Sequence, residues 1–137
     1  MTIFYRLLQF YCLFNEMDQE NNYELEIKNN MENEKPLVSI LLAVYNPNYE
    51  WFKEQLSSLN NQNYNNLELI VYDDCPDNPV DERFIKNCIS NFSYHIIRGK
   101  QNKGSNFAFE ELTKYGKGEY FAYCDQDDIW EKIKSQK

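Results

Sequence analysis

The chain has 137 residues, of which 42% are hydrophobic and 16% aromatic, so it holds enough apolar material for a folded core and too much for a disordered segment. Its formal net charge of −8 includes no block of Lys or Arg, which argues against a nucleic-acid partner. The four cysteines form no Cys-x-x-Cys pair, and the single histidine does not lie at ligand spacing from them, so the usual zinc patterns are absent. We expect reduced thiols and a cytoplasmic location.

The first 34 residues differ from the rest of the chain in amino-acid composition. Residues 3–14 are mostly apolar, but this segment is too short to cross a bilayer and carries no signal-peptide cleavage site. An amphipathic surface helix remains open there, so peripheral membrane association is one alternative. Residues 15–34 are rich in Asn and Glu. We therefore expect residues 1–34 to be a leader, a linker or a misassigned start, and residues 35–137 to form the folded domain.

Beyond this segment, apolar runs of strand length alternate with segments of helical periodicity. The expected strands are 37–44, 67–72, 94–98 and 120–124. The expected helices are centred on 52–59, 80–89 and 108–115. This order predicts an α/β fold with a doubly wound parallel sheet. Ligands of such sheets bind beyond the carboxyl ends of the strands, so we look for function in the loops after Val44, Tyr72 and Cys124.

Two of these three loops carry clusters of acidic residues. Asp73-Asp74 follows the second strand, and Asp125-Gln126-Asp127-Asp128 follows the fourth. Clustered carboxylates repel one another unless a cation, a ligand rich in donors or a helix N-terminus compensates their charge. Oxygen ligands without His or Cys favour Mg²⁺ or Mn²⁺, which proteins often hold together with substrate phosphates. The position favours a nucleoside-diphosphate site, while helix capping and turn formation are the structural alternatives.

Other candidate residues carry weaker signals. The ring of Tyr45, on the third loop, is suited to stacking on a base or to ordinary packing. His95 lies inside an expected strand, away from these loops, and we expect it to be structural. The loop from Gly99 to Gly104 lacks the Gly-Lys-Ser/Thr ending of a phosphate-binding loop. Trp130 fits a core anchor better than a substrate platform.

Four segments in order resemble the inverting family 2 glycosyltransferases of the GT-A fold. The resemblance covers about Lys35 to Trp130. It consists of VSILLAVYNP, WFKEQLSSLNNQNYNNLELIVYDDCPDNP, NKGSNFAFEELTKYGKGEYFAYC and DQDDIW, the last as the DxD motif. The form DQDDIW is also similar to members described as rhamnosyltransferases. The resemblance implies a Rossmann-like, mostly parallel sheet of the GT-A type.

The resemblance also implies which residues bind the donor. Tyr45 would stack near the nucleobase, and Asp74 would hydrogen-bond the base with support from Asp73. Asp125 would lie near the ribose and the diphosphate. The implied nucleotide-binding residues are Ala43, Tyr45, Asp73, Asp74 and Asp125, and the implied metal ligands are Asp127 and Asp125.

The activity implied by the family is sugar transfer from a nucleotide-diphosphate sugar, UDP- or dTDP-linked, to a saccharide or lipid-linked acceptor in cell-surface polysaccharide synthesis. Bound Mg²⁺ or Mn²⁺ would neutralise the charge on the leaving nucleoside diphosphate while an acceptor hydroxyl attacks the anomeric carbon. Family members continue well beyond the DxD motif and take their general base from that later part. Because this sequence ends at Lys137, we expect a domain truncated after the DxD motif that keeps the donor-binding half.

Two alternatives stay open. A catalytically inactive fragment or nucleotide-binding module would keep the fold without turnover. A phosphoacceptor signalling domain would place an acidic pair after the first strand, where Tyr45-Asn46-Pro47 stands, so the sequence disfavours it.

Overall fold

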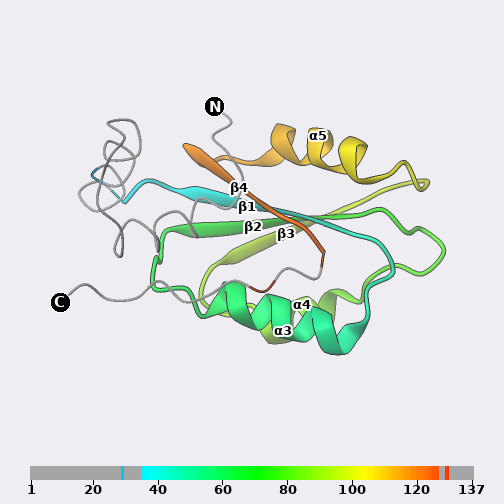
Figure 1. Cartoon of the computed structure of the whole chain (residues 1–137), viewed down its shortest axis with the longest axis horizontal. Helices are drawn as coiled ribbons and strands as arrows, with labels where there is room; N and C mark the ends of the chain where they lie inside the picture. Colours follow the sequence, from blue (N-terminus) through cyan, green and yellow to red (C-terminus); the bar gives the residue numbers. More distant parts are fainter. Residues whose placement is uncertain (1–28, 30–34, 127–128, 130–137) are drawn as a thin grey trace.

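Four parallel strands, separated by three helices, make up the centre of the molecule. The computed structural model describes residue 29, residues 35–126 and residue 129 (Figure 1). The elements in chain order are β1 (Val38–Val44), α3 (Tyr49–Asn60), β2 (Leu67–Asp73), α4 (Glu82–Cys88), β3 (Ser93–Arg98), α5 (Ser105–Tyr115) and β4 (Tyr120–Cys124). The predicted alternation of strands and helices is confirmed, and the predicted fourth strand has the observed bounds.

The strands lie in the order β3-β2-β1-β4, and all of their pairings are parallel. The chain therefore runs outward from β1 to β3 and then returns to the other side of β1 to form β4. Since parallel crossovers are right-handed, this reversal moves the connecting helix to the other face of the sheet. Figure 1 shows α3 and α4 below the sheet and α5 above it. The predicted doubly wound fold is confirmed, and the reversal lies between β1 and β4.

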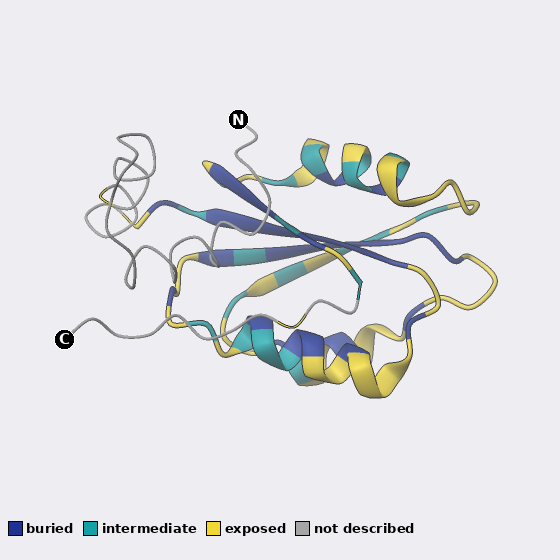
Figure 2. Cartoon of the chain, viewed as in Figure 1, coloured by how far each residue is buried: buried dark blue, intermediate teal, exposed yellow. Residues whose placement is uncertain are grey.

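Both faces of β1 are covered, which explains why its sequence is apolar apart from Ser39. Every residue of β1 is buried (Figure 2). Ile40, Leu42 and Val44 face the layer of α3 and α4, where Phe52, Leu56 and Leu59 of α3 pack against them. Leu41 and Ala43 face α5 and pack with its Ala108 and Leu112. The carboxyl end of β1 is therefore held rigidly from both sides.

Side-chain caps set the starts of the two helices on the α3 face. The Oδ1 atom of Asn48 accepts hydrogen bonds from the backbone N–H groups of Glu50 and Trp51, so α3 begins directly after the Pro47 break. Asp81 caps α4 in the same way. The second helix expected around residues 80–89 is present as α4, with Val80 before its Asp81 cap and Ile89 as its C-cap.

No helix in the described ranges is long and apolar enough to cross a membrane. The expected leader, residues 1–34, lies outside the described residues except for residue 29.

Candidate functional site

A cavity of about 230 Å³ opens where the strand order reverses, at the carboxyl ends of β1 and β4. The first turns of α5 form its other wall. It is lined by Ala43, Val44, Tyr45, Asp74, Ser105, Ala108, Phe109, Asp125 and Gln126. Four of the residues predicted from the sequence thus come together here: Ala43, Tyr45, Asp74 and Asp125.

Two consecutive residues after β4 form hydrogen bonds with other parts of the fold, one with the end of β1 and one with α3. The backbone N–H of Tyr45 donates to Oε1 of Gln126 at 2.6 Å. The side-chain Nε2 of Gln55, on α3, donates to the backbone carbonyl of Asp125 at 2.6 Å. These contacts span 81 and 70 residues of sequence. They hold the beginning of the DxD segment against the end of β1.

Asp74 lines the cavity and also anchors the start of α5. Its carboxylate oxygens accept the backbone N–H of Lys103 at 2.9 Å and that of Gly104 at 2.8 Å. Gly104 is the N-cap of α5 at a φ of 88°, where glycine is favoured, and it supplies no side-chain cap. Asp74, in the loop directly after β2, therefore caps α5 in place of a side chain at Gly104, and its negative charge suits a helix N-terminus.

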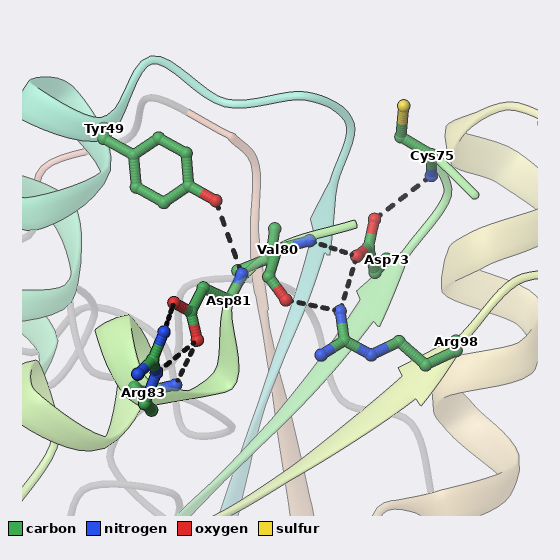
Figure 3. A network of polar contacts seen from close by, with 7 residues as sticks. All are labelled: Tyr49, Asp73, Cys75, Val80, Asp81, Arg83 and Arg98. Atoms are coloured by element: carbon green, nitrogen blue, oxygen red, sulfur yellow. Dashed lines mark hydrogen bonds and ion pairs between the residues drawn. The ribbon is translucent and has the colours of Figure 1, made fainter. Parts of the chain in front are cut away.

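Asp73 lies outside this cavity. Successive side chains of a strand point to opposite sides, so Asp73 and Asp74 diverge. The Asp73 carboxylate accepts the backbone N–H groups of Cys75 at 3.1 Å and Val80 at 2.7 Å, and it pairs with Nη1 of Arg98 at 2.8 Å (Figure 3). Arg98 also donates to the Val80 carbonyl at 2.7 Å. This network closes the turn between β2 and α4 and lines a separate cavity of about 560 Å³.

The charge of the Asp73-Asp74 pair is thus compensated within the protein, by a guanidinium and four backbone N–H groups. The turn and capping contacts that the sequence left open are both present. Next to the pair, burial and the negative charge of Asp74 raise the pKa of Tyr72, so its phenol stays neutral at neutral pH.

The remaining candidates lie elsewhere. His95 is exposed on β3, with its ring centroid 6.0 Å from that of Tyr115. Asp127, Asp128 and Trp130 lie outside the described residues, so the predicted metal ligand Asp127 is not placed. Within the described ranges, no group of three His, Cys, Asp or Glu side chains is arranged to hold a metal ion. The cavity lining offers carboxylate, hydroxyl and amide oxygens without His or Cys, a donor set that suits Mg²⁺ or Mn²⁺.

Several residues at the site were not predicted from the sequence. Ser105 and Phe109 line the cavity from α5, and Gln126 was noted only as part of the acidic cluster. The signal for Ser105 was its position directly after Gly104, at the start of an expected helix. Gln55 gave no signal, because its partner lies 70 residues away in the sequence.

Comparison with known proteins places these features in a family. The family model described as "Glycosyl transferase family 2" matches residues 39–137. Over 107 residues the chain is 28% identical to TuaG of Bacillus subtilis, a glycosyltransferase assigned to teichuronic acid biosynthesis, covering 78% of this chain and 42% of TuaG. Over 94 residues it is 34% identical to the Escherichia coli UDP-Glc:alpha-D-GlcNAc-diphosphoundecaprenol beta-1,3-glucosyltransferase WfgD, covering 69% of this chain and 36% of WfgD. The chain spans less than half the length of either relative.

A solved structure shows the same architecture. The mannosyltransferase PcManGT from Pyrobaculum calidifontis, determined in complex with GDP-Man and Mn²⁺, superposes with a TM-score of 0.60 at 20% identity, covering 69% of this chain and 28% of PcManGT. This likeness supports the fold, which is part of a GT-A domain. With the family match over residues 39–137, it follows that the chain belongs to glycosyl transferase family 2.

Proposed function

We propose that this chain binds a nucleotide-diphosphate sugar in the cavity at the carboxyl ends of β1 and β4, as the donor-binding part of a glycosyltransferase. One observation carries the proposal. Tyr45, Asp74 and Asp125 arrive from three different strand ends and line a single cavity at the point where the strand order reverses. Open α/β sheets bind their ligands at this point.

Each of these side chains supplies a different kind of contact. Tyr45 is 48% exposed, so much of its side chain is accessible for stacking on a nucleobase. Asp74 lines the cavity and is held there by the backbone N–H groups of Lys103 and Gly104, so its place in the cavity wall is fixed. Ser105, in the first turn of α5, adds a hydroxyl donor to the cavity lining for a diphosphate oxygen.

Asp125, together with Asp127, is the pair we propose to hold Mg²⁺ or Mn²⁺ along with the donor diphosphate. When bound, the ion neutralises the negative charge that develops on the departing nucleoside diphosphate. The described residues orient the donor, so that an acceptor hydroxyl attacks the anomeric carbon on the face opposite the leaving group. That displacement inverts the anomeric configuration.

The relatives support a class of substrates. The names of WfgD and TuaG point to lipid-linked acceptors and cell-wall polysaccharide, and PcManGT was crystallised with GDP-Man. We propose transfer of a hexosyl or rhamnosyl group to a saccharide or lipid-linked acceptor, with UDP- and dTDP-sugars as the first donors to test. We also propose action in the cytoplasm, since the described cysteines Cys75, Cys88 and Cys124 form no disulfide.

Calorimetric titration of the 137-residue chain with UDP, dTDP and GDP, each with and without Mn²⁺, tests the proposal. Tyr45→Ala should weaken the best nucleotide about tenfold, because stacking on a base contributes about 1–3 kcal/mol. Tyr115→Ala is the matched control, since Tyr115 is 45% exposed but lies at the far end of α5. No binding of any nucleotide, or equal losses in both variants, would contradict the proposal.

A nucleotide-binding module without turnover is the second candidate, because the described cavity accounts for donor binding alone. It predicts the same binding but no transfer of sugar to a lipid-linked saccharide. A transfer assay with radiolabelled donor separates the two.

A further inference from the structure

We propose that Gln55 is a positioning residue for the donor site, whose buried amide fixes the backbone that presents Asp125 to the cavity. The inference rests on the proposed function, because the role of Asp125 is part of that proposal. It assigns a task to a side chain that is not among the residues lining the cavity.

Gln55 is placed by the rigid part of the fold. It lies in the middle of α3, is 0% exposed, and is next in sequence to the buried Leu56. Its Nε2 atom donates to the Asp125 carbonyl at 2.6 Å and lies 3.4 Å from Sγ of Cys124. A helix anchored in the core holds such a donor more accurately than a loop does. Gln55 therefore connects the α3 layer to the first residue after β4.

The buried amide carries a stability cost on its acceptor side. The Oε1 atom of Gln55 is buried and has no hydrogen-bond partner among the described residues. A buried acceptor that is left unsatisfied destabilises the fold, whereas an apolar side chain of equal length would avoid this loss. Among the described residues, the amide contacts the Asp125 carbonyl at 2.6 Å and the weaker acceptor Sγ of Cys124 at 3.4 Å, so the contact with Asp125 is its stronger one. We infer that the residue is used for that contact.

The hydrogen bond between Gln55 and Asp125 also affects the position of Tyr45. Gln126, the next residue after Asp125, accepts the Tyr45 backbone N–H. The two hydrogen bonds therefore depend on each other: Gln55 fixes the Asp125 backbone, and the fixed backbone places Gln126 against the end of β1. Without the Gln55 donor, the Asp125–Gln126 segment gains freedom, and both Asp125 and the Tyr45 N–H lose their fixed places. A displacement of about 1 Å at such a site is enough to weaken it strongly.

The test uses Gln55→Met in the full 137-residue chain, since Met has similar length and no amide. The matched control is Gln62→Met, because Nε2 of Gln62 donates to the Ser58 carbonyl at 3.0 Å, four residues earlier and away from the cavity. Two quantities are measured: hydrogen exchange of the Tyr45 amide by NMR, and affinity for UDP and GDP with Mn²⁺. In Gln55→Met we expect roughly tenfold faster exchange and roughly tenfold weaker affinity, the size expected for one lost hydrogen bond. In Gln62→Met we expect neither change.

The outcomes separate this inference from the proposed function. Unchanged Tyr45 exchange in Gln55→Met overturns the positioning role, whether or not the wild-type chain binds a nucleotide. Faster exchange with unchanged nucleotide affinity also overturns it. Absence of nucleotide binding in the wild-type chain refutes the proposed function, and the exchange result still decides whether Gln55 fixes the segment. If Gln55→Met and Gln55→Leu both lower the melting temperature by more than about 5 °C, a domain-wide loss of about 1 kcal/mol, Gln55 serves stability instead and the inference fails.

Discussion

Replacing Asp73 by Asn should destabilise the domain, although Asp73 lies at the strand end where a ligand site is expected. The Asp73 side chain is 1% exposed and receives two backbone N–H groups and the Arg98 guanidinium. An Asn side chain keeps one acceptor oxygen, and its NH₂ group then faces one of these donors. The pair with Arg98 loses its charge, which leaves the guanidinium only the Val80 carbonyl.

The expected cost follows from these contacts. Breaking a buried ion pair costs about 3–5 kcal/mol, and a hydrogen bond to a charged group contributes about 1.5–3 kcal/mol. Arg98 is 42% exposed and regains water when the pair breaks, so the lower end applies. We expect a loss of about 3 kcal/mol in the free energy of unfolding, which for a domain of this size lowers the melting temperature by roughly 12–24 °C.

Urea and thermal unfolding followed by circular dichroism measure this loss. Asp77→Asn is the control, because Asp77 is an exposed acid in the same turn. It should change the melting temperature by no more than about 2 °C, since surface substitutions are usually within about 0.5 kcal/mol. A drop of less than about 4 °C for Asp73→Asn, below about 1 kcal/mol, would refute the structural role assigned to this carboxylate.

Three further outcomes are expected. Gly118→Ala should lower the melting temperature by more than about 8 °C, because a Cβ there would lie 2.6 Å from the Leu37 carbonyl oxygen and force β1 and β4 apart. Burial and the charge of Asp74 raise the pKa of Tyr72 above its ordinary 10.0. The stability that the neutral phenol contributes should therefore be complete below about pH 10 and fall as the pH rises further. In urea unfolding, Tyr72→Phe should reduce this alkaline loss of stability. A chain that begins at Lys35 should melt within about 5 °C of the full chain, because the acid- and Asn-rich segment before it offers no core face; a larger drop by calorimetry would contradict this.

Much of the fold could be predicted from local sequence. The strands β1 and β4 are apolar apart from Ser39 because both faces of the sheet are covered, and this pattern is visible without a structure. The helix bounds were harder to predict. The start of α4 depends on whether Asp81 caps the helix or continues the turn, and nothing in the apolar periodicity distinguishes these two cases.

The site was predictable only in part, for a physical reason. Loops at the carboxyl ends of parallel strands must meet at one edge of the sheet, so Tyr45, Asp74 and Asp125 could be grouped before their contacts were known. The difference between Asp73 and Asp74 depends on which neighbour each side chain faces, and that is set by the register of β2 with β3, where Asp73 pairs with Arg98. Contacts such as Gln55 with Asp125 arise from packing across the chain and leave no local pattern.

The central claim is that a metal-bound nucleoside diphosphate occupies the cavity between the ends of β1 and β4. Paramagnetic broadening of backbone amide signals by substoichiometric Mn²⁺ in the presence of UDP or GDP tests it directly. Signals of Tyr45, Ser105 and Asp125 should broaden. Signals of Lys117 and Ser93 should stay sharp, because both lie beside Glu68, which pairs with Ser39. Ser39 is six residues before Tyr45, about 20 Å along a strand that rises about 3.3 Å per residue. Uniform broadening, or broadening centred on Asp73 and Arg98, would contradict the account.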